Sequence, residues 1–210
     1  MKIEISLIIN RAIQLLLAFL FIHNVSSRLF LPIIAVFITE MIGGATLTTV
    51  GFAVALYSIA KSIVQVPVAR YTDTHDGEYD DFYIMLAGSL ITAIYSFGFI
   101  IISTPLHLYL LSSFGGVGAA LLMAGYYGIF ARHVDKGSEG FEWSLFSVGG
   151  LTISTAIGGA IGGIFADMFG FSMLFMVSGS LAMVASLLLI FLRPYMYKMR
   201  REMKVPPLKI

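Results

Sequence analysis

Two basic residues lie inside long apolar stretches, where an ionised group is costly. Arg28 falls close to the middle of residues 12–39, and Lys61 lies inward of the middle of residues 47–69. Every Asp and Glu lies in a connecting segment or at the end of an apolar stretch, so neither cation has a carboxylate at a matching depth. Unpaired positive charge in an apolar medium requires water or an anion to compensate it. We therefore expect Arg28 and Lys61 to face a water-filled cavity that attracts an anionic substrate.

Polar neighbours share helix faces with these two cations. Asn24 precedes Arg28 by four residues, while Tyr57, Lys61 and Gln65 recur at a spacing of four. Residues four apart lie on one face of a helix. Together with Tyr126 in a later apolar stretch, these six residues are the predicted substrate-binding set.

A purely structural explanation of the two cations is also open. The flexible side chain of Lys61 could extend to the inner membrane surface. Arg28 could donate to backbone carbonyls that Pro32 frees one turn later, because proline interrupts the hydrogen bonding of a helix. In that case neither residue would bind a substrate.

The composition is that of a polytopic membrane protein. Of 210 residues, 58% are hydrophobic and only 12% charged, and the mean hydropathy is +0.91. A soluble domain of this size does not carry so much apolar surface. The net charge of +1 gives no sign of a nucleic-acid partner, and the lack of cysteine excludes disulfides and thiolate metal sites.

Hydropathy divides the chain into six predicted transmembrane helices, so we expect an all-α membrane protein. Their expected ranges are residues 12–39, 47–69, 82–102, 106–130, 143–166 and 171–192. Residues 1–192 would form the transmembrane domain and residues 193–210 a basic tail. That tail either lies on the anionic inner leaflet as a short helix or is a solvated end.

Lysine and arginine placement predicts the orientation. Outside the spans these residues fall only in the terminal segments and in the loops on the same side, and the three opposite turns have none. By the positive-inside rule both termini should be cytoplasmic, in a cell inner membrane.

Small residues and a proline are candidates for packing or movement rather than chemistry. Gly158 and Gly162 belong to a stripe of small residues spaced by four, which lets helix backbones approach closely. We expect these two glycines, Pro32 and Asp73 to matter for packing or conformational change. The acidic loop at residues 71–81 fails the spacing of an EF-hand, so we expect it to be solvated and expect no metal or cofactor.

Intramembrane enzymes need residue patterns that this chain lacks. No histidine follows His133, and no Gly-x-Ser-Gly sequence occurs, as a rhomboid-type protease would need. Asp80 and Asp81 stand as a single pair where a prenyltransferase needs two aspartate-rich motifs. We therefore do not expect an enzyme.

Three short stretches resemble motifs of the major facilitator superfamily. Residues 65–73, Gln-Val-Pro-Val-Ala-Arg-Tyr-Thr-Asp, are similar to the entry of its loop signature, with Asp73 at the key aspartate but without the basic residues that follow. Residues 112–120 resemble its Arg-x-x-x-Gly-x-Gly-Ala-Ala stretch, with Ser112 in place of arginine. Residues 158–163 resemble its antiporter pattern Gly-Pro-x-x-Gly-Gly, without the proline.

The resemblance implies a transporter built from two six-helix halves, of which six predicted helices make one. The halves of this family are parallel repeats, so a parallel homodimer with C2 symmetry could rebuild the whole. The first and fourth helices would line the path, and the second and fifth would meet the partner. Paired arginines in the first helices of organic-phosphate members suggest a phosphate ester or carboxylate as the substrate.

The predicted function is therefore transport of a small anion by alternating access, through facilitated diffusion or exchange. Membrane lipids would be the other partner. The alternatives are a non-transporting scaffold or receptor, and one half of a heterodimeric transporter.

Overall fold

The protein is all-helical across the residues that the structure describes. This computed structural model describes residues 9–74 and 77–196, and every regular element within them is a helix, as predicted. Five continuous helical stretches there are long and apolar enough to cross a membrane. They are Arg11–Met41, Leu47–Asp73, Tyr79–Gly98, Pro105–His133 and Glu139–Tyr195. The N-terminal residues 1–8 and most of the predicted basic tail lie outside the described residues.

The first membrane-length stretch is regular through its polar part and tightens only at the proline. Helix α1 (Arg11–Phe30) begins at Asn10, whose side chain accepts a hydrogen bond from the Ile13 amide at 2.9 Å. A 3-10 turn, η1 (Leu31–Ile33), carries Pro32 and leads into α2 (Ile34–Met41). The polar residues 23–28 belong to a continuous α-helix, and only the proline disturbs it.

Hydroxyl caps and a proline define the next three helices. Helix α3 (Leu47–Asp73) starts with a capping box, in which Thr46 and Thr49 bond each other's backbone amides. Helix α4 (Tyr79–Gly98) ends four residues before the predicted limit. Helix α5 (Pro105–His133) has Thr104 as its N-cap and a proline in its first turn, where a missing amide costs nothing.

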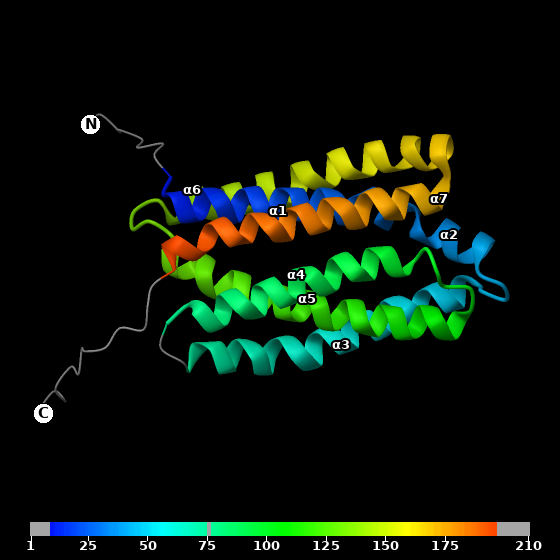
Figure 1. The fold of residues 1–210 in the computed structure, drawn as a ribbon, viewed down its shortest axis with the longest axis horizontal. Helices are drawn as coiled ribbons and strands as arrows, with labels where there is room; N and C mark the ends of the chain where they lie inside the picture. Colours follow the sequence, from blue (N-terminus) through cyan, green and yellow to red (C-terminus); the bar gives the residue numbers. More distant parts are fainter. Residues whose placement is uncertain (1–8, 75–76, 197–210) are drawn as a thin grey trace, which may run out of the picture.

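The C-terminal part is a long helical stretch with two irregularities. It consists of α6 (Glu139–Leu145), the π-helical turn η2 (Phe146–Ile153), α7 (Ser154–Leu188) and the 3-10 turn η3 (Leu189–Tyr195). Within α7, Gly170 has φ 78° and ψ 170°, a conformation that glycine adopts without a steric penalty. Figure 1 shows the two legs of α7, yellow before the turn and orange after it, running back alongside one another.

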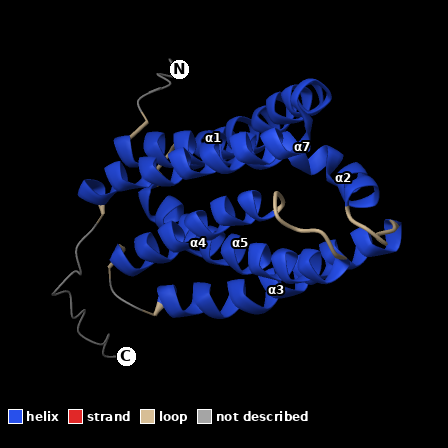
Figure 2. Ribbon diagram, turned by 45° about the vertical axis from the view of Figure 1, so that its right-hand side comes forward, coloured by secondary structure: helices blue, strands red, loops and turns tan. Residues whose placement is uncertain are grey.

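The helices form two packed layers. Helix α1 packs on α7, α3 packs on α5, and α4 contacts both α5 and α7. Figures 1 and 2 show α1 and α7 on one side of the bundle and α3 on the other, with α4 and α5 between them. Helix α3 contributes the least buried surface of the membrane-length segments, with 11% of its most apolar stretch buried against 56% for α5.

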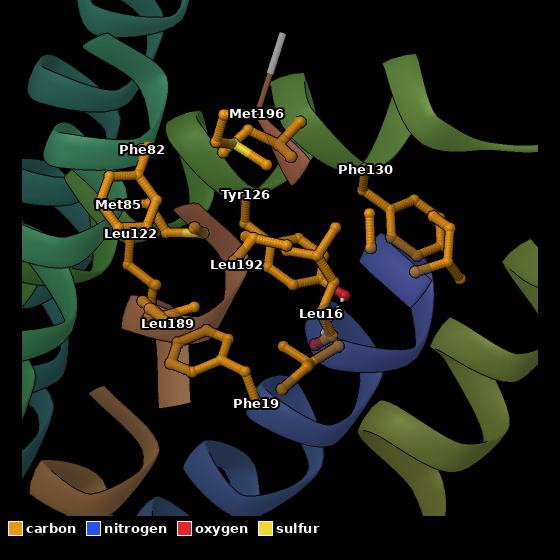
Figure 3. Close-up of a cluster of buried hydrophobic side chains, with 14 of the residues drawn as sticks. Leu16, Phe19, Phe82, Met85, Leu122, Tyr126, Phe130, Leu189, Leu192 and Met196 are labelled. Carbon is orange, nitrogen blue, oxygen red and sulfur yellow. Dashed lines mark hydrogen bonds between the residues drawn. The ribbon is translucent and has the colours of Figure 1, made fainter. Parts of the chain in front are cut away.

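Two apolar clusters fill the ends of the bundle. One holds Leu16, Phe19, Tyr126 and Phe130 near the start of α1, and Figure 3 shows it closed by η3 residues such as Leu192. The other gathers residues from the far end of the bundle: Leu29, Phe30, Phe37, Phe99, Leu108, Leu174 and Phe175. Along α1 the polar residues 23–28 fall between the two clusters, so the polar part of the helix lies at mid-height of the bundle.

Small and hydroxylated residues form the seam between α1 and α7. Ser26 Oγ donates to the Ser178 carbonyl at 2.7 Å, and Ser178 Oγ donates to the Ser26 carbonyl at 2.8 Å. On the other leg of α7, a Cβ placed on Gly158 would lie 2.7 Å from the Cβ of Arg28, and one on Gly162 would overlap the Leu29 backbone. The glycine stripe therefore fixes the position of α1 at the height of Arg28.

This seam yields a stability test with a neighbouring control. We expect Gly162→Ala to lower the free energy of unfolding by about 1–3 kcal/mol, because the added methyl must push α1 away. Gly163→Ala should be neutral, since no atom lies within 4 Å of the added Cβ. Thermal unfolding of both variants in the same detergent measures the difference. Equal midpoints would contradict the close approach at Gly162.

Candidate functional site: a cationic cavity at mid-height of the bundle

A cavity of about 500 Å³ lies between the two apolar clusters and receives residues from nearly every helix. Its polar lining consists of His23, Asn24, Ser26, Ser27, Arg28, Tyr57, Ser58, Lys61, Thr92, Tyr95, Ser96, Ser112 and Tyr127. None of its described lining residues is acidic. The volume falls within the range of small-molecule sites, about 300–1,000 Å³. The lining is therefore polar, net cationic and large enough for an organic ligand.

Arg28 is held at the cavity wall without a compensating group. It is half-buried, and its Nε is fully enclosed with no hydrogen-bond partner among the described residues. No ion pair of Arg28 is found in that part of the chain either. Among the described residues, no carbonyl near Pro32 accepts a hydrogen bond from Arg28. The described contacts therefore do not support the structural explanation of Arg28 that was raised from the sequence. An enclosed, unpartnered guanidinium nitrogen is costly, and a bound anion would satisfy it.

Lys61 and Tyr57 reach the same cavity from the opposite wall. They lie one turn apart on α3, and both line the cavity together with Ser58. The Tyr57 phenol is close enough to Arg28 to interact with it electrostatically, and its ring centroid lies 6.1 Å from that of Tyr95 on α4. Two cations and two phenols, from three helices, thus surround one space.

Asn24 and His23 line the cavity on the α1 side. The Asn24 amide donates to the Gly150 carbonyl at 3.0 Å, within the π-helical turn η2. The same carbonyl also accepts from the Ser154 hydroxyl at 2.6 Å, so two side chains converge on one backbone oxygen of this turn. His23 stacks on Phe19 and has an enclosed Nδ1 without a partner in the described chain. The predicted set does not include Tyr95, Ser112 or Tyr127. Tyr95 lies on α4 and the other two lie on α5, so tertiary packing brings them to the cavity.

Two of the predicted binding residues lie away from this cavity. Gln65 is half-buried on α3, one turn beyond Lys61, and is not part of the cavity lining. Tyr126 is fully buried in the apolar cluster of Figure 3, where its hydroxyl donates to the Leu16 carbonyl at 3.4 Å. Its neighbour Tyr127 faces the cavity instead. A shift of one residue turns a helical side chain by about 100°, so position alone could not separate the two.

The four residues predicted for conformational roles occupy three different settings. Pro32 is exposed in η1, and Asp73 is the exposed last residue of α3. Gly158 and Gly162 face α1, as described above. Their packing is evident from these contacts, and a part in movement stays a prediction.

A family model supplies the relationship that the degenerate motifs only suggested. The model of the Major Facilitator Superfamily matches residues 16–206. This chain belongs to the major facilitator superfamily. Proteins of this superfamily are multi-pass membrane transporters, in agreement with the apolar helices found here.

One relative in the superfamily is much longer than the region that it shares with this chain. It is similar to an uncharacterised MFS-type transporter of Methanocaldococcus jannaschii, with 27% identity over 159 residues. The match covers 75% of this chain and 39% of the relative. The match thus spans well under half of the relative's length.

An ion cluster joins the start of α4 to the end of α5, at the end of the bundle that is predicted to face the cytoplasm. The superfamily pattern did not predict this cluster. Arg132 near the end of α5 pairs with Glu78 at 3.0 Å and with Asp81, both from the start of α4. The two carboxylates are 1% and 0% exposed. The superfamily signature carries basic residues in this loop, whereas here the loop supplies the acids and α5 supplies the base.

The described residues contain no group of three or more His, Cys, Asp or Glu side chains that could hold a metal ion. His75 and Asp76 of the acidic loop lie outside the described residues, so the solvated state expected for that loop stays a prediction.

Arg28 and Arg132 should respond oppositely to loss of charge. Arg28→Met removes an uncompensated guanidinium, so we expect it to raise the free energy of unfolding by about 1 kcal/mol in anion-free buffer. Arg132→Met removes the partner of two buried carboxylates and should lower it by about 2 kcal/mol or more. Thermal unfolding without added anions compares them. A destabilisation of Arg28→Met similar to that of Arg132→Met would show that Arg28 is structurally satisfied.

Proposed function

We propose that this superfamily member transports a small organic anion by alternating access, with Arg28 and Lys61 as the binding cations. The supporting observation is the cavity itself, which brings both cations together and has no acidic residue among its described lining. The protein would cross the cell inner membrane six times, with both termini on the cytoplasmic side. In support, the stretch Glu139–Tyr195 would be about 85 Å long as one helix, nearly three times the hydrocarbon thickness. The turn at Gly170 makes it two crossings.

The cavity is incomplete within one chain, which favours assembly. Leu31, Val54 and Ser58 line it and are nonetheless exposed, so its wall is open between α1 and α3. A second six-helix unit placed against this opening would close it. We propose a parallel homodimer with C2 symmetry, which sets two Arg28 side chains around one central path.

Two stripes of exposed apolar side chains suit such an interface or lipid. On α3 these side chains are Phe52, Ile59, Ile63 and Val66, which fall on one face, on the other side of the helix from Lys61. On the first leg of α7 they are Ile153, Ile157, Ile161, Ile164 and Met168. The glycine stripe of that leg faces α1, so the opposite face is left for the partner or for lipid.

Anion transport should depend on Arg28 far more than on an arginine elsewhere in the same helix. We expect Arg28→Gln to reduce anion binding by about tenfold to a hundredfold, because it removes a charge-assisted hydrogen bond. Arg11→Gln should have no effect, since Arg11 is exposed and bonds only Gln14 in the described chain. Counterflow of labelled phosphate esters and carboxylates into proteoliposomes measures both variants. Equal counterflow by the wild type and Arg28→Gln would contradict the proposal.

The homodimer predicts a defined mass in a lipid bilayer. The protein in nanodiscs should measure about 45.8 kDa after correction for lipid, twice the 22.9 kDa of one chain. Light scattering or mass photometry reports it. A stable 22.9 kDa species would contradict the homodimer, and counterflow would then decide between a transporter completed by a different chain and a scaffold that moves nothing.

A further inference from the structure

The lining of the cavity changes character along the membrane normal. Arg28, Lys61 and Asn24 occupy its middle and inner part. The side chains further out along each helix are apolar without exception among the described residues. They are Ile34, Ile38, Val50, Val54, Phe99 and Leu108.

The apolar end is a formed wall rather than a loose surface. Phe99 stacks on Phe175 with ring centroids 5.1 Å apart and lies 5.4 Å from Phe30. Phe99, Leu108 and Ile38 are each 2% exposed or less. Because these side chains are fixed by their own cluster, the apolar end of the cavity persists without a ligand.

The distance between the two ends suits a ligand several carbons long. Ile34 follows Arg28 by six residues, which is about 9 Å along a helix at ~1.5 Å per residue. A hydrated inorganic anion at Arg28 would leave the apolar end filled with water that has few hydrogen-bonding partners. A ligand with an apolar body would displace that water while its charge reaches the guanidinium.

From this gradient we infer that the substrate is an amphiphilic organic anion: a carboxylate that carries an apolar body. Its carboxylate lies at Arg28, with Tyr57 and Lys61 beside it, and its body extends toward Val54 and Phe99. This inference rests on the proposed anion site and names the class of anion that it takes. It disfavours inorganic phosphate and sugar phosphates, which have no apolar part to place against the outer wall.

A series of straight-chain carboxylates tests the two ends separately. Binding of butyrate, hexanoate and octanoate to the protein in nanodiscs is measured by calorimetry at pH 7.5, with empty nanodiscs as the blank for partition into lipid. We expect the Kd to fall by about fourfold for each added methylene until the apolar end is full. Octanamide, which has the same body without the charge, should bind at least tenfold more weakly than octanoate.

Two variants separate the charged end from the apolar end. Arg28→Gln should weaken all three carboxylates by a similar factor of about ten or more and leave the dependence on chain length intact. Val54→Asn places an amide in the apolar wall, so it should weaken octanoate by about tenfold and leave butyrate unchanged. Val184→Asn is the matched control, because Val184 is half exposed on the second leg of α7 and lies outside the cavity lining.

The outcomes distinguish this inference from the proposed function. If the carboxylates bind with one common Kd that still depends on Arg28, or if phosphate binds as tightly as octanoate, the apolar body is overturned and the anion site stands. If no anion in the series or among the phosphate esters binds in a way that depends on Arg28, both fall. If Val54→Asn leaves the dependence on chain length unchanged, the placement of the apolar body at Val54 is overturned as well.

Discussion

Two positive charges held at mid-height of an apolar bundle dominate the energetics of this chain. Arg28 and Lys61 have no carboxylate among the described residues of their cavity, so burying them fully would cost more than packing could return. The bundle meets this constraint by keeping a space open between two apolar clusters. The clusters supply stability at both ends, and the polar cavity between them is what the charges require. The open polar cavity and the architecture of the core are therefore parts of one solution.

Placement of α1 is the second requirement, because it carries Arg28. A guanidinium can be held at a fixed height only if its helix cannot slide or rotate. The reciprocal serine hydrogen bonds to Ser178 and the close approach of Gly158 provide that restraint from both legs of α7. The Asn24 amide adds a third contact, to the Gly150 carbonyl in the π-helical turn. Three independent contacts thus fix the polar segment of α1, each from a different kind of chemistry.

Sequence alone could identify the helices and the two cations, since hydropathy and charge placement are properties of the chain order. It could also bring Tyr57 and Lys61 together, because both lie on one helix. It could not choose Tyr127 over Tyr126, because that depends on the rotation of α5 against its neighbours. Nor could it anticipate Tyr95 and Ser112, which reach the cavity only through tertiary packing. The π-helical turn and the ion pair between Arg132 and Asp81 have no local sequence signal, for they depend on contacts between distant segments.

The sparse burial of α3 has a consequence for how the chain is made. Helix α3 follows α2 in the sequence, yet its main packing partner is α5, which begins only at Pro105. During synthesis α3 must therefore enter the membrane and wait there until α5 has been inserted. Throughout that interval Lys61 has no cavity to face, and lipid headgroups or water drawn to its flexible side chain must solvate it. Completion of the cavity wall thus depends on a helix that stays undocked until α4 and α5 have been made.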